Sequence, residues 1–199
     1  MKTLAAALAV LLVAGCSLTR EEPVVHYVLR DGGAARSVAG AARPADRTLV
    51  VAGTVTDSFY DTTAIAFSRE EGKRGAYQYA FWTERPGRAL HGLLVARLAA
   101  AGLYAAVVPS AVGLPGDLEL QTEVHSLYHD VREAPGVARV RLTATLVDRR
   151  QQRLLARRTF AAEAPASAYS AAGAVDGFNA AVRRVLDDLV VWLREIPPR

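Results

Sequence analysis

The sequence contains a single cysteine, Cys16, in 199 residues. No disulfide can therefore form within the chain, and a zinc site built from several cysteines is excluded. The sequence also lacks a Gly-Lys-Ser/Thr phosphate-binding loop, a Gly-x-Gly-x-x-Gly dinucleotide motif and a Gly-x-Ser-x-Gly nucleophile elbow. We therefore expect no ATP hydrolysis and no serine-hydrolase chemistry, and we predict that the protein is not an enzyme.

Lysine is almost absent, because only Lys2 and Lys73 among the 24 basic residues are lysines. The formal net charge of +4 is compatible with an acidic partner or with membrane headgroups, and equally with a general preference for arginine. The densest basic cluster comprises Arg149, Arg150, Arg153, Arg157 and Arg158. This cluster is either a solvated hairpin tip or a docking surface for an acidic partner or headgroups.

Long hydrophobic runs are also missing. The longest, residues 4–13, falls short of the about 20 apolar residues that span a bilayer, so it is typical of a signal peptide. It ends in Leu12-Val13-Ala14-Gly15-Cys16, which is similar to the lipobox of bacterial lipoproteins. We predict cleavage before Cys16 and attachment of diacylglycerol and an N-acyl chain to that cysteine. Several acyl chains make such attachment effectively permanent.

This targeting segment divides the chain into a signal peptide (1–15), a lipidated tether (16–23) and a single periplasmic domain (24–196). Ser17 follows the cysteine where an aspartate would resemble an inner-membrane retention signal. By analogy with lipoprotein sorting, we expect the periplasmic face of the outer membrane of a Gram-negative bacterium. Nucleic acid is excluded as a partner by this compartment.

Two segments of the predicted domain alternate between apolar and polar residues over more than ten positions. In residues 118–128 the even positions include Leu118, Leu120, Val124 and Tyr128, and residues 138–148 repeat the pattern. Such a period of two predicts long strands with one buried face. A third strand is predicted at 154–162, where Arg157 and Arg158 indicate a bulge or a sheet edge.

Shorter strands and two helices complete the prediction. The strands are expected at 26–30, 49–55, 64–68, 76–82 and 104–108, with a loop over 31–47. Pro86 begins one helix and Gly102 ends it in a left-handed conformation, while a second helix extends from about 170 to 194. We predict an α+β fold in which an antiparallel or mixed β-sheet carries both helices on one face, the even-numbered face of the long strands.

Histidines are the best candidates for metal ligands. His125 and His129 would lie on one face of a strand but about 13 Å apart, too far for one ion. His26 and His91 are isolated in the sequence. We therefore predict no metal and no cofactor other than the covalent lipid on Cys16.

Several segments together resemble the ABC-type transport auxiliary lipoproteins, the Pqi-type lipoproteins of Gram-negative bacteria. They are His26-Tyr27-Val28-Leu29 soon after the cysteine, Tyr79-Ala80-Phe81-Trp82-Thr83-Glu84-Arg85-Pro86 before the first helix, Leu118-Glu119-Leu120, Val140-Arg141-Leu142-Thr143-Ala144-Thr145-Leu146-Val147-Asp148, Ala156-Arg157-Arg158-Thr159-Phe160, and the last helix to Trp192-Leu193. The stretch 31–47 is longer than the family usually shows.

The resemblance implies a non-enzymatic outer-membrane docking component. In such systems a cytoplasmic ATPase, a permease and a periplasmic protein of the mammalian-cell-entry (MCE) type move lipids or other hydrophobic molecules between the two membranes and so support membrane integrity. The family provides no catalytic residue to carry over. A lipid-carrying lipoprotein and a regulatory lipoprotein of envelope assembly enzymes are the alternatives.

The odd-numbered face of the long strands is expected to lie away from the helices. It carries Arg139 and Arg141, and the hairpin tip adds Arg149, Arg150 and Arg153. Mixed charges suit a specific polar contact rather than an apolar one. We predict that this face docks the transporter or another copy of the chain.

Overall fold

A computed structural model describes residues 22–32 and 45–196. Its elements, in chain order, are β1 (Val25–Tyr27), β2 (Ala45–Val51), β3 (Val55–Thr56), β4 (Ala64–Ser68), β5 (Gly75–Trp82), α2 (Pro86–Ala101), β6 (Tyr104–Pro109), the 3-10 turn η1 (Ser110–Val112), β7 (Leu118–Asp130), β8 (Val137–Asp148), β9 (Arg153–Pro165) and α3 (Ala171–Glu195). The predicted signal peptide, Cys16 and most of the predicted 31–47 loop lie outside the described residues.

The described strands form one mixed sheet that divides at β7. Along one edge, β7 pairs with β8, and β8 with β9, in a long antiparallel meander. The other edge of β7 is shared by β2, β3 and β4, all parallel to it. Beyond them, β6 extends the sheet from β2, while β5 and β1 extend it from β4. The predicted α+β class is therefore confirmed.

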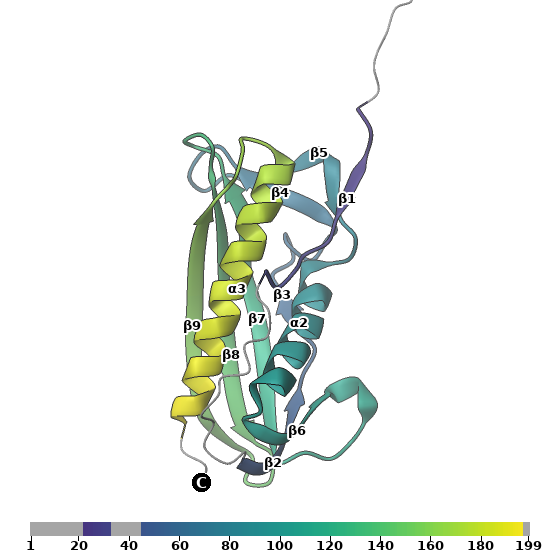
Figure 1. Cartoon of the computed structure of the whole chain (residues 1–199), viewed down its shortest axis with the longest axis vertical. Helices are drawn as coiled ribbons and strands as arrows, with labels where there is room; N and C mark the ends of the chain where they lie inside the picture. The colour runs from purple at the N-terminus through teal and green to yellow at the C-terminus, as the bar shows by residue number, and fades with distance from the viewer. Residues whose placement is uncertain (1–21, 33–44, 197–199) are drawn as a thin grey trace, which may run out of the picture.

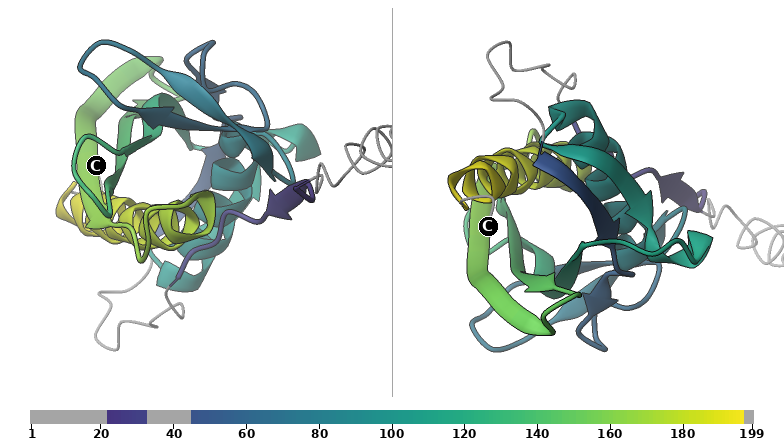
Figure 2. Two further views of the ribbon diagram at one scale, coloured as in Figure 1. Left: turned by 90° about the horizontal axis from the view of Figure 1, so that it is seen from above. Right: turned by 90° about the horizontal axis from the view of Figure 1, so that it is seen from below.

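Helices α2 and α3 lie side by side on the concave face of this sheet, and the sheet curls around them (Figures 1 and 2). The even-numbered residues of β8 are buried beneath α3, with Leu142 and Ala144 fully inaccessible. Phe178 of α3 packs edge-on against Trp82 of β5, with 5.4 Å between ring centroids. For β8 the helices therefore cover the face that the sequence predicts.

The ends of both helices follow from local sequence. Gly102 takes a left-handed conformation with φ of 61° after α2, which glycine adopts without steric cost. Ser170 caps α3, because its hydroxyl accepts a hydrogen bond from the backbone N–H of Gly173. Neither helix is long and apolar enough to cross a membrane, a statement that covers the described residues alone.

A bulge in β7 corrects the predicted alternation. Val124 pairs with Leu142 and Ser126 with Arg141, so His125 is an extra residue in the strand. One extra residue exchanges the two faces of everything that follows it, since side chains alternate with a period of two. The expectation that the even-numbered residues beyond Val124, such as Tyr128, face the helices is therefore wrong.

The same bulge decides where the second half of β7 places its side chains. Leu127 and His129 are buried at 1% and 0% exposure, whereas Tyr128 turns to the outer surface. The prediction that His125 and His129 share one exposed face is wrong for the same reason. On the other side of the meander, Leu155 is an extra residue in β9, and β9 pairs with β8 alone among the described strands, as its sequence predicts.

Candidate functional site

The outer face of the meander, away from both helices, carries Arg139 and Arg141 of the predicted docking residues, whereas Arg153 lies opposite Asp148 on the even-numbered face. Beyond the bulge, Ser126 lies opposite Arg141 and Tyr128 lies opposite Arg139 on the neighbouring strand. Residues directly opposite each other share one face of a sheet. The part of this face beyond the bulge therefore combines Tyr128, Arg139 and Arg141, a combination that simple alternation does not predict.

Asp130, the last residue of β7, organises the charges at this end of the strand. The guanidinium of Arg132 donates to its carboxylate at 2.7 and 2.9 Å, and Nε of Arg139 donates at 2.9 Å. Although Asp130 is only 6% exposed, these bonds hold its pKa far below the ordinary carboxyl value, and the bonds from Arg132 are the main cause. Arg139 also forms an ion pair with Glu163 of β9.

The structure separates the five predicted arginines into two sets. Arg139 is paired as described, Arg149 lies 3.5 Å from Glu119, and Arg150 lies 2.5 Å from Asp117. Arg141 and Arg153 are exposed, and neither side chain has a hydrogen bond or ion pair with any other residue that the structure describes. These two guanidinium groups are the members of the predicted set that are available to a partner without first breaking an existing contact.

A further arginine, Arg74 of the β4–β5 loop, contacts the outer face beyond the bulge. Its guanidinium carbon lies 3.7 Å from the centre of the Tyr128 ring, a stacked cation–π arrangement. It donates hydrogen bonds to the Tyr60 hydroxyl at 3.0 Å, to the Lys73 carbonyl at 2.9 Å and to Ser68 at 3.3 Å. All three acceptors are neutral, so none of these hydrogen bonds compensates the positive charge of Arg74.

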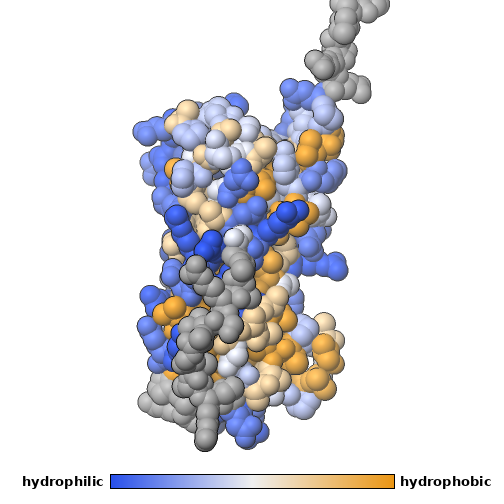
Figure 3. Space-filling view, viewed as in Figure 1, coloured by the Kyte–Doolittle hydropathy of each residue, from blue (hydrophilic) through white to orange (hydrophobic). Residues whose placement is uncertain are grey.

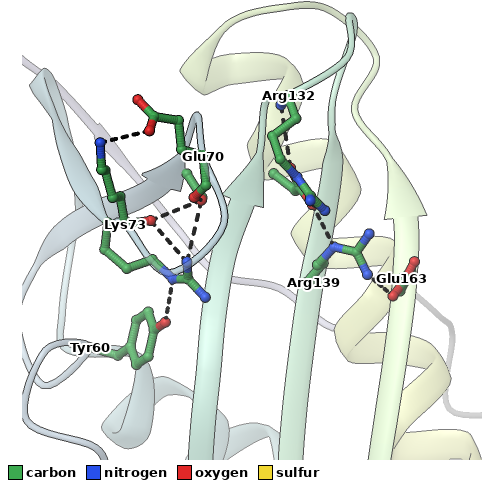
Figure 4. Close-up of polar contacts among 9 residues, drawn as sticks. Tyr60, Glu70, Lys73, Arg132, Arg139 and Glu163 are labelled. Carbon is green, nitrogen blue, oxygen red and sulfur yellow. Dashed lines mark hydrogen bonds and ion pairs between the residues drawn. The ribbon is translucent and has the colours of Figure 1, made fainter.

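A pocket of about 400 Å³ lies between the β4–β5 loop and the ends of β7 and β8. Figure 4 shows Tyr60 and Lys73 on one side of this region and Arg132 and Arg139 on the other. The pocket is lined by Ser68, Glu71, Gly72, Arg74, Tyr128, Asp130, Arg132 and Arg139. We call it the Arg74 pocket.

A second group of polar side chains surrounds the bulge itself. Single ligand atoms of Asp57, Glu123 and His125 lie within 4.8 Å of one another. Nε2 of His125 is 2.8 Å from the Thr143 hydroxyl, and the Arg157 guanidinium is 3.9 Å from the Glu123 carboxylate. The carboxylates and the imidazole are suitable for a divalent cation, but Arg157 already supplies positive charge there.

The comparisons with known proteins decide the family. The model of the ABC-type transport auxiliary lipoprotein component matches residues 27–190. The chain belongs to this family. The search of curated proteins found no match to this auxiliary component.

Solved structures share the fold of the auxiliary component. A crystal structure of a protein from Xanthomonas campestris is 24% identical, with a TM-score of 0.70 over 86% of this chain and 93% of that one. A hypothetical protein from Chlamydia trachomatis is 7% identical, with a TM-score of 0.51 over 76% of this chain and 98% of that one. At such identities the likeness concerns the fold alone.

The family description names an auxiliary transport component and indicates no enzyme family. The residues that sequence reasoning missed in this auxiliary component are Arg74 and Arg132. Each is an ordinary loop arginine in the sequence. The bulge at His125 brings Tyr128 to the face where Arg74 contacts it, and Asp130 to the face where Arg132 contacts it. An irregularity in the alternation after Val124, with Leu127 at an odd position, was the available signal.

Proposed function

We propose that the chain is a non-enzymatic adaptor, anchored through lipid on Cys16 at the periplasmic face of the outer membrane. Its domain would dock an MCE-type periplasmic protein, which works with an ABC permease and ATPase to move lipids or other hydrophobic molecules between the membranes. The observation that carries this proposal is the match of the auxiliary lipoprotein family to residues 27–190. The lipobox that ends at Cys16 supports the anchor.

The outer face of the meander is the proposed docking surface. Both helices pack on the opposite face (Figure 2), so this one is left to solvent or to a partner. Arg141 lies exposed on it, and the carboxylate of Glu123 is half-exposed nearby on β7. Arg153 is exposed at the adjoining hairpin tip, where its position opposite Asp148 puts it on the even-numbered face. Such a mixture favours a polar, electrostatically specific contact, which depends on complementary charge more than on apolar area.

Co-purification from envelope extracts tests the docking surface. The double variant Arg141→Glu, Arg153→Glu should bring down less of the MCE-type protein than the wild-type chain, because two unpaired cations become anions. The stability of the fold should change by about 0.5 kcal/mol or less at each exposed position. Arg139 is left unchanged, since it compensates the buried carboxylate of Asp130.

The matched control is Arg194→Glu, an exposed arginine of α3 on the helical side of the molecule. It should leave co-purification at the wild-type level. Equal recovery with the double variant and with this control would refute the docking surface. Failure of the wild-type chain to bring down any MCE-type protein, permease or ATPase would refute the adaptor function itself.

A further inference from the structure

The Arg74 pocket has more cationic than anionic groups in its lining. Arg74, Arg132 and Arg139 contribute three guanidinium groups, while Asp130 and Glu71 contribute two carboxylates. The Asp130 carboxylate is held between Arg132 and Arg139 and accepts from both. It therefore presents no uncompensated negative charge to a ligand.

Each of these arginines has hydrogen-bonding capacity left. Arg132 uses Nε and Nη2 on Asp130, and Arg139 uses Nε on Asp130 and Nη1 on Glu163. Within the described residues, this leaves Nη1 of Arg132 and Nη2 of Arg139 without an acceptor. Arg74 bonds only to neutral oxygens and is held in place by the Tyr128 ring. Planar guanidinium groups held in fixed positions are well suited to the oxygens of a phosphate group.

The position of the pocket indicates where such a phosphate would come from. The chain enters the domain at the same end of the long axis as the β4–β5 and β7–β8 loops that form the pocket (Figure 1). Cys16 precedes Glu22, the first described residue, by six residues. Six residues span at most about 20 Å. A lipid on Cys16 would therefore keep this end of the domain close to the headgroups of its own membrane.

Exposed apolar side chains lie at the same end. Val24 and Val28, on either side of β1, are 55% and 45% exposed, and Tyr79 of the adjacent β5 is 40% exposed. Figure 3 shows hydrophobic residues beside the point at which the chain enters. Exposed tyrosine and valine side chains at the end of a domain that bears a lipid anchor are typical of a surface that rests at a membrane interface.

We propose that the Arg74 pocket binds the phosphate group of a phospholipid headgroup in the membrane that carries the anchor. The choice of a bilayer lipid rests on the lipid anchor of the proposed function, whereas the phosphate chemistry rests on the pocket alone. Arg74 and Arg132 approach the phosphate from the two sides of the pocket, and Arg139 adds a donor from β8. Binding would fix the orientation of the domain on its membrane.

A titration of the full chain in dodecyl maltoside micelles, whose headgroups carry no phosphate, tests this proposal. Dihexanoyl-phosphatidylglycerol and, separately, inorganic phosphate are added at constant ionic strength set with chloride. Because a ligand that binds the folded state raises its melting temperature, the rise in Tm gives the apparent affinity. Arg74→Gln should weaken phospholipid binding about tenfold, since it removes one charge-assisted interaction.

Two further variants separate this site from general electrostatics. Arg153→Gln, at the opposite end of the meander, should change the affinity less than about twofold, because screening leaves little interaction beyond the Debye length. Arg74→Lys retains the charge without the planar fork and should bind with intermediate affinity. The Tm of each variant without ligand shows that it is folded and serves as its own reference.

Equal phospholipid binding by Arg74→Gln and the wild type would overturn the proposal, as would equal losses in Arg74→Gln and Arg153→Gln. Arg74-dependent binding of inorganic phosphate without phospholipid binding would assign the pocket to free phosphate and refute the membrane source. Arg74-dependent binding of hexaglutamate in place of phospholipid would assign it to an acidic protein partner, which also overturns the proposal. No transporter protein is present in this titration, so its failure is distinct from failure of the docking function.

Discussion

Nε of Arg139 lies 2.9 Å from Oδ2 of Asp130, across the pair of strands β7 and β8. Without the extra residue at His125, Asp130 would face the helices and Arg139 would face solvent. The bulge thus allows a carboxylate that is only 6% exposed to meet two guanidinium groups. The contact joins the fold to the proposed phosphate site, because the same arginines line the Arg74 pocket.

This contact predicts a pH-dependent contribution to stability. The pKa of Asp130 is lowered in the folded state, mainly by hydrogen bonds from Arg132, so its ionised form stabilises the fold above the ordinary carboxyl pKa of about 4. That contribution should be lost as the pH falls below this value toward the lowered pKa. Asp130→Asn should reduce the free energy of unfolding by about 1.5–3 kcal/mol at pH 7.

Urea unfolding followed by circular dichroism measures this effect at pH 7 and at steps below pH 4. The difference between Asp130→Asn and the wild type should shrink as the solution becomes more acidic. Asp188→Asn, at an exposed position of α3, is the control and should cost about 0.5 kcal/mol or less. A constant difference at all pH values would contradict the assignment.

Gly136, in the loop between β7 and β8, is predicted to be intolerant of any side chain. Its φ is +95°, and an added Cβ would lie 2.1 Å from Nε2 of the buried His129. Gly72 has a similar φ of +74°, but a Cβ there meets nothing within 4 Å. Gly72→Ala should therefore cost about 1–2 kcal/mol from the left-handed backbone alone. Gly136→Ala should cost more than that in the same chemical unfolding experiment, and equal costs would contradict the role of His129.

Replacement of Cys16 by alanine tests the predicted anchor. The lipobox cysteine supplies the thiol that takes diacylglycerol, so Cys16→Ala should abolish lipid labelling and leave unprocessed precursor. Metabolic labelling with a radioactive fatty acid and immunoblotting of membrane fractions provide the measurement. Ser17→Ala is a neighbouring control that should be labelled and cleaved normally. Normal labelling of Cys16→Ala would refute lipidation at this residue.

We predict that the group formed by Asp57, Glu123 and His125 does not retain zinc. The imidazole already contacts Thr143, and the Arg157 guanidinium lies beside Glu123. Elemental analysis of the purified full chain should find no stoichiometric zinc. Chelators should leave the Tm of both the wild type and His125→Ala unchanged. Stoichiometric zinc that disappears in His125→Ala would establish a metal site here.

Much of the fold follows from regularities that the sequence displays directly. The period of two in residues 138–148 predicted β8 and its buried face, since its even-numbered positions are all buried and its register with β7 and β9 places them on one face. Pro86 and Gly102 fixed the limits of α2, because each has a conformational preference strong enough to act locally. A helix from about 170 to 194 was predicted, and α3 lies there with Phe178 and Leu189 on its buried side.

The candidate site could be predicted only in part. Arg141 and Arg153 are exposed as expected, but only Arg141 lies on the predicted face, because the extra residue Leu155 puts Arg153 opposite Asp148. The partners of Arg139 were not predicted, because the phase of β7 changes at His125 and the only sequence signal of the change is the apolar Leu127 at an odd position. The Arg74 pocket depends on three segments distant in sequence, and pairings of this kind are set by tertiary packing rather than by local pattern.

The hairpin turn at residues 149–152 lies at the opposite end of the long axis from the point where the chain enters the domain (Figure 1). Between these ends lies β7, a strand of 13 residues. At about 3.3 Å per residue this corresponds to roughly 40 Å. A domain anchored at one end would therefore hold Arg150 and Arg153 at a fixed distance from its membrane. The length of the long strands would determine how far from the membrane the adaptor can contact a partner.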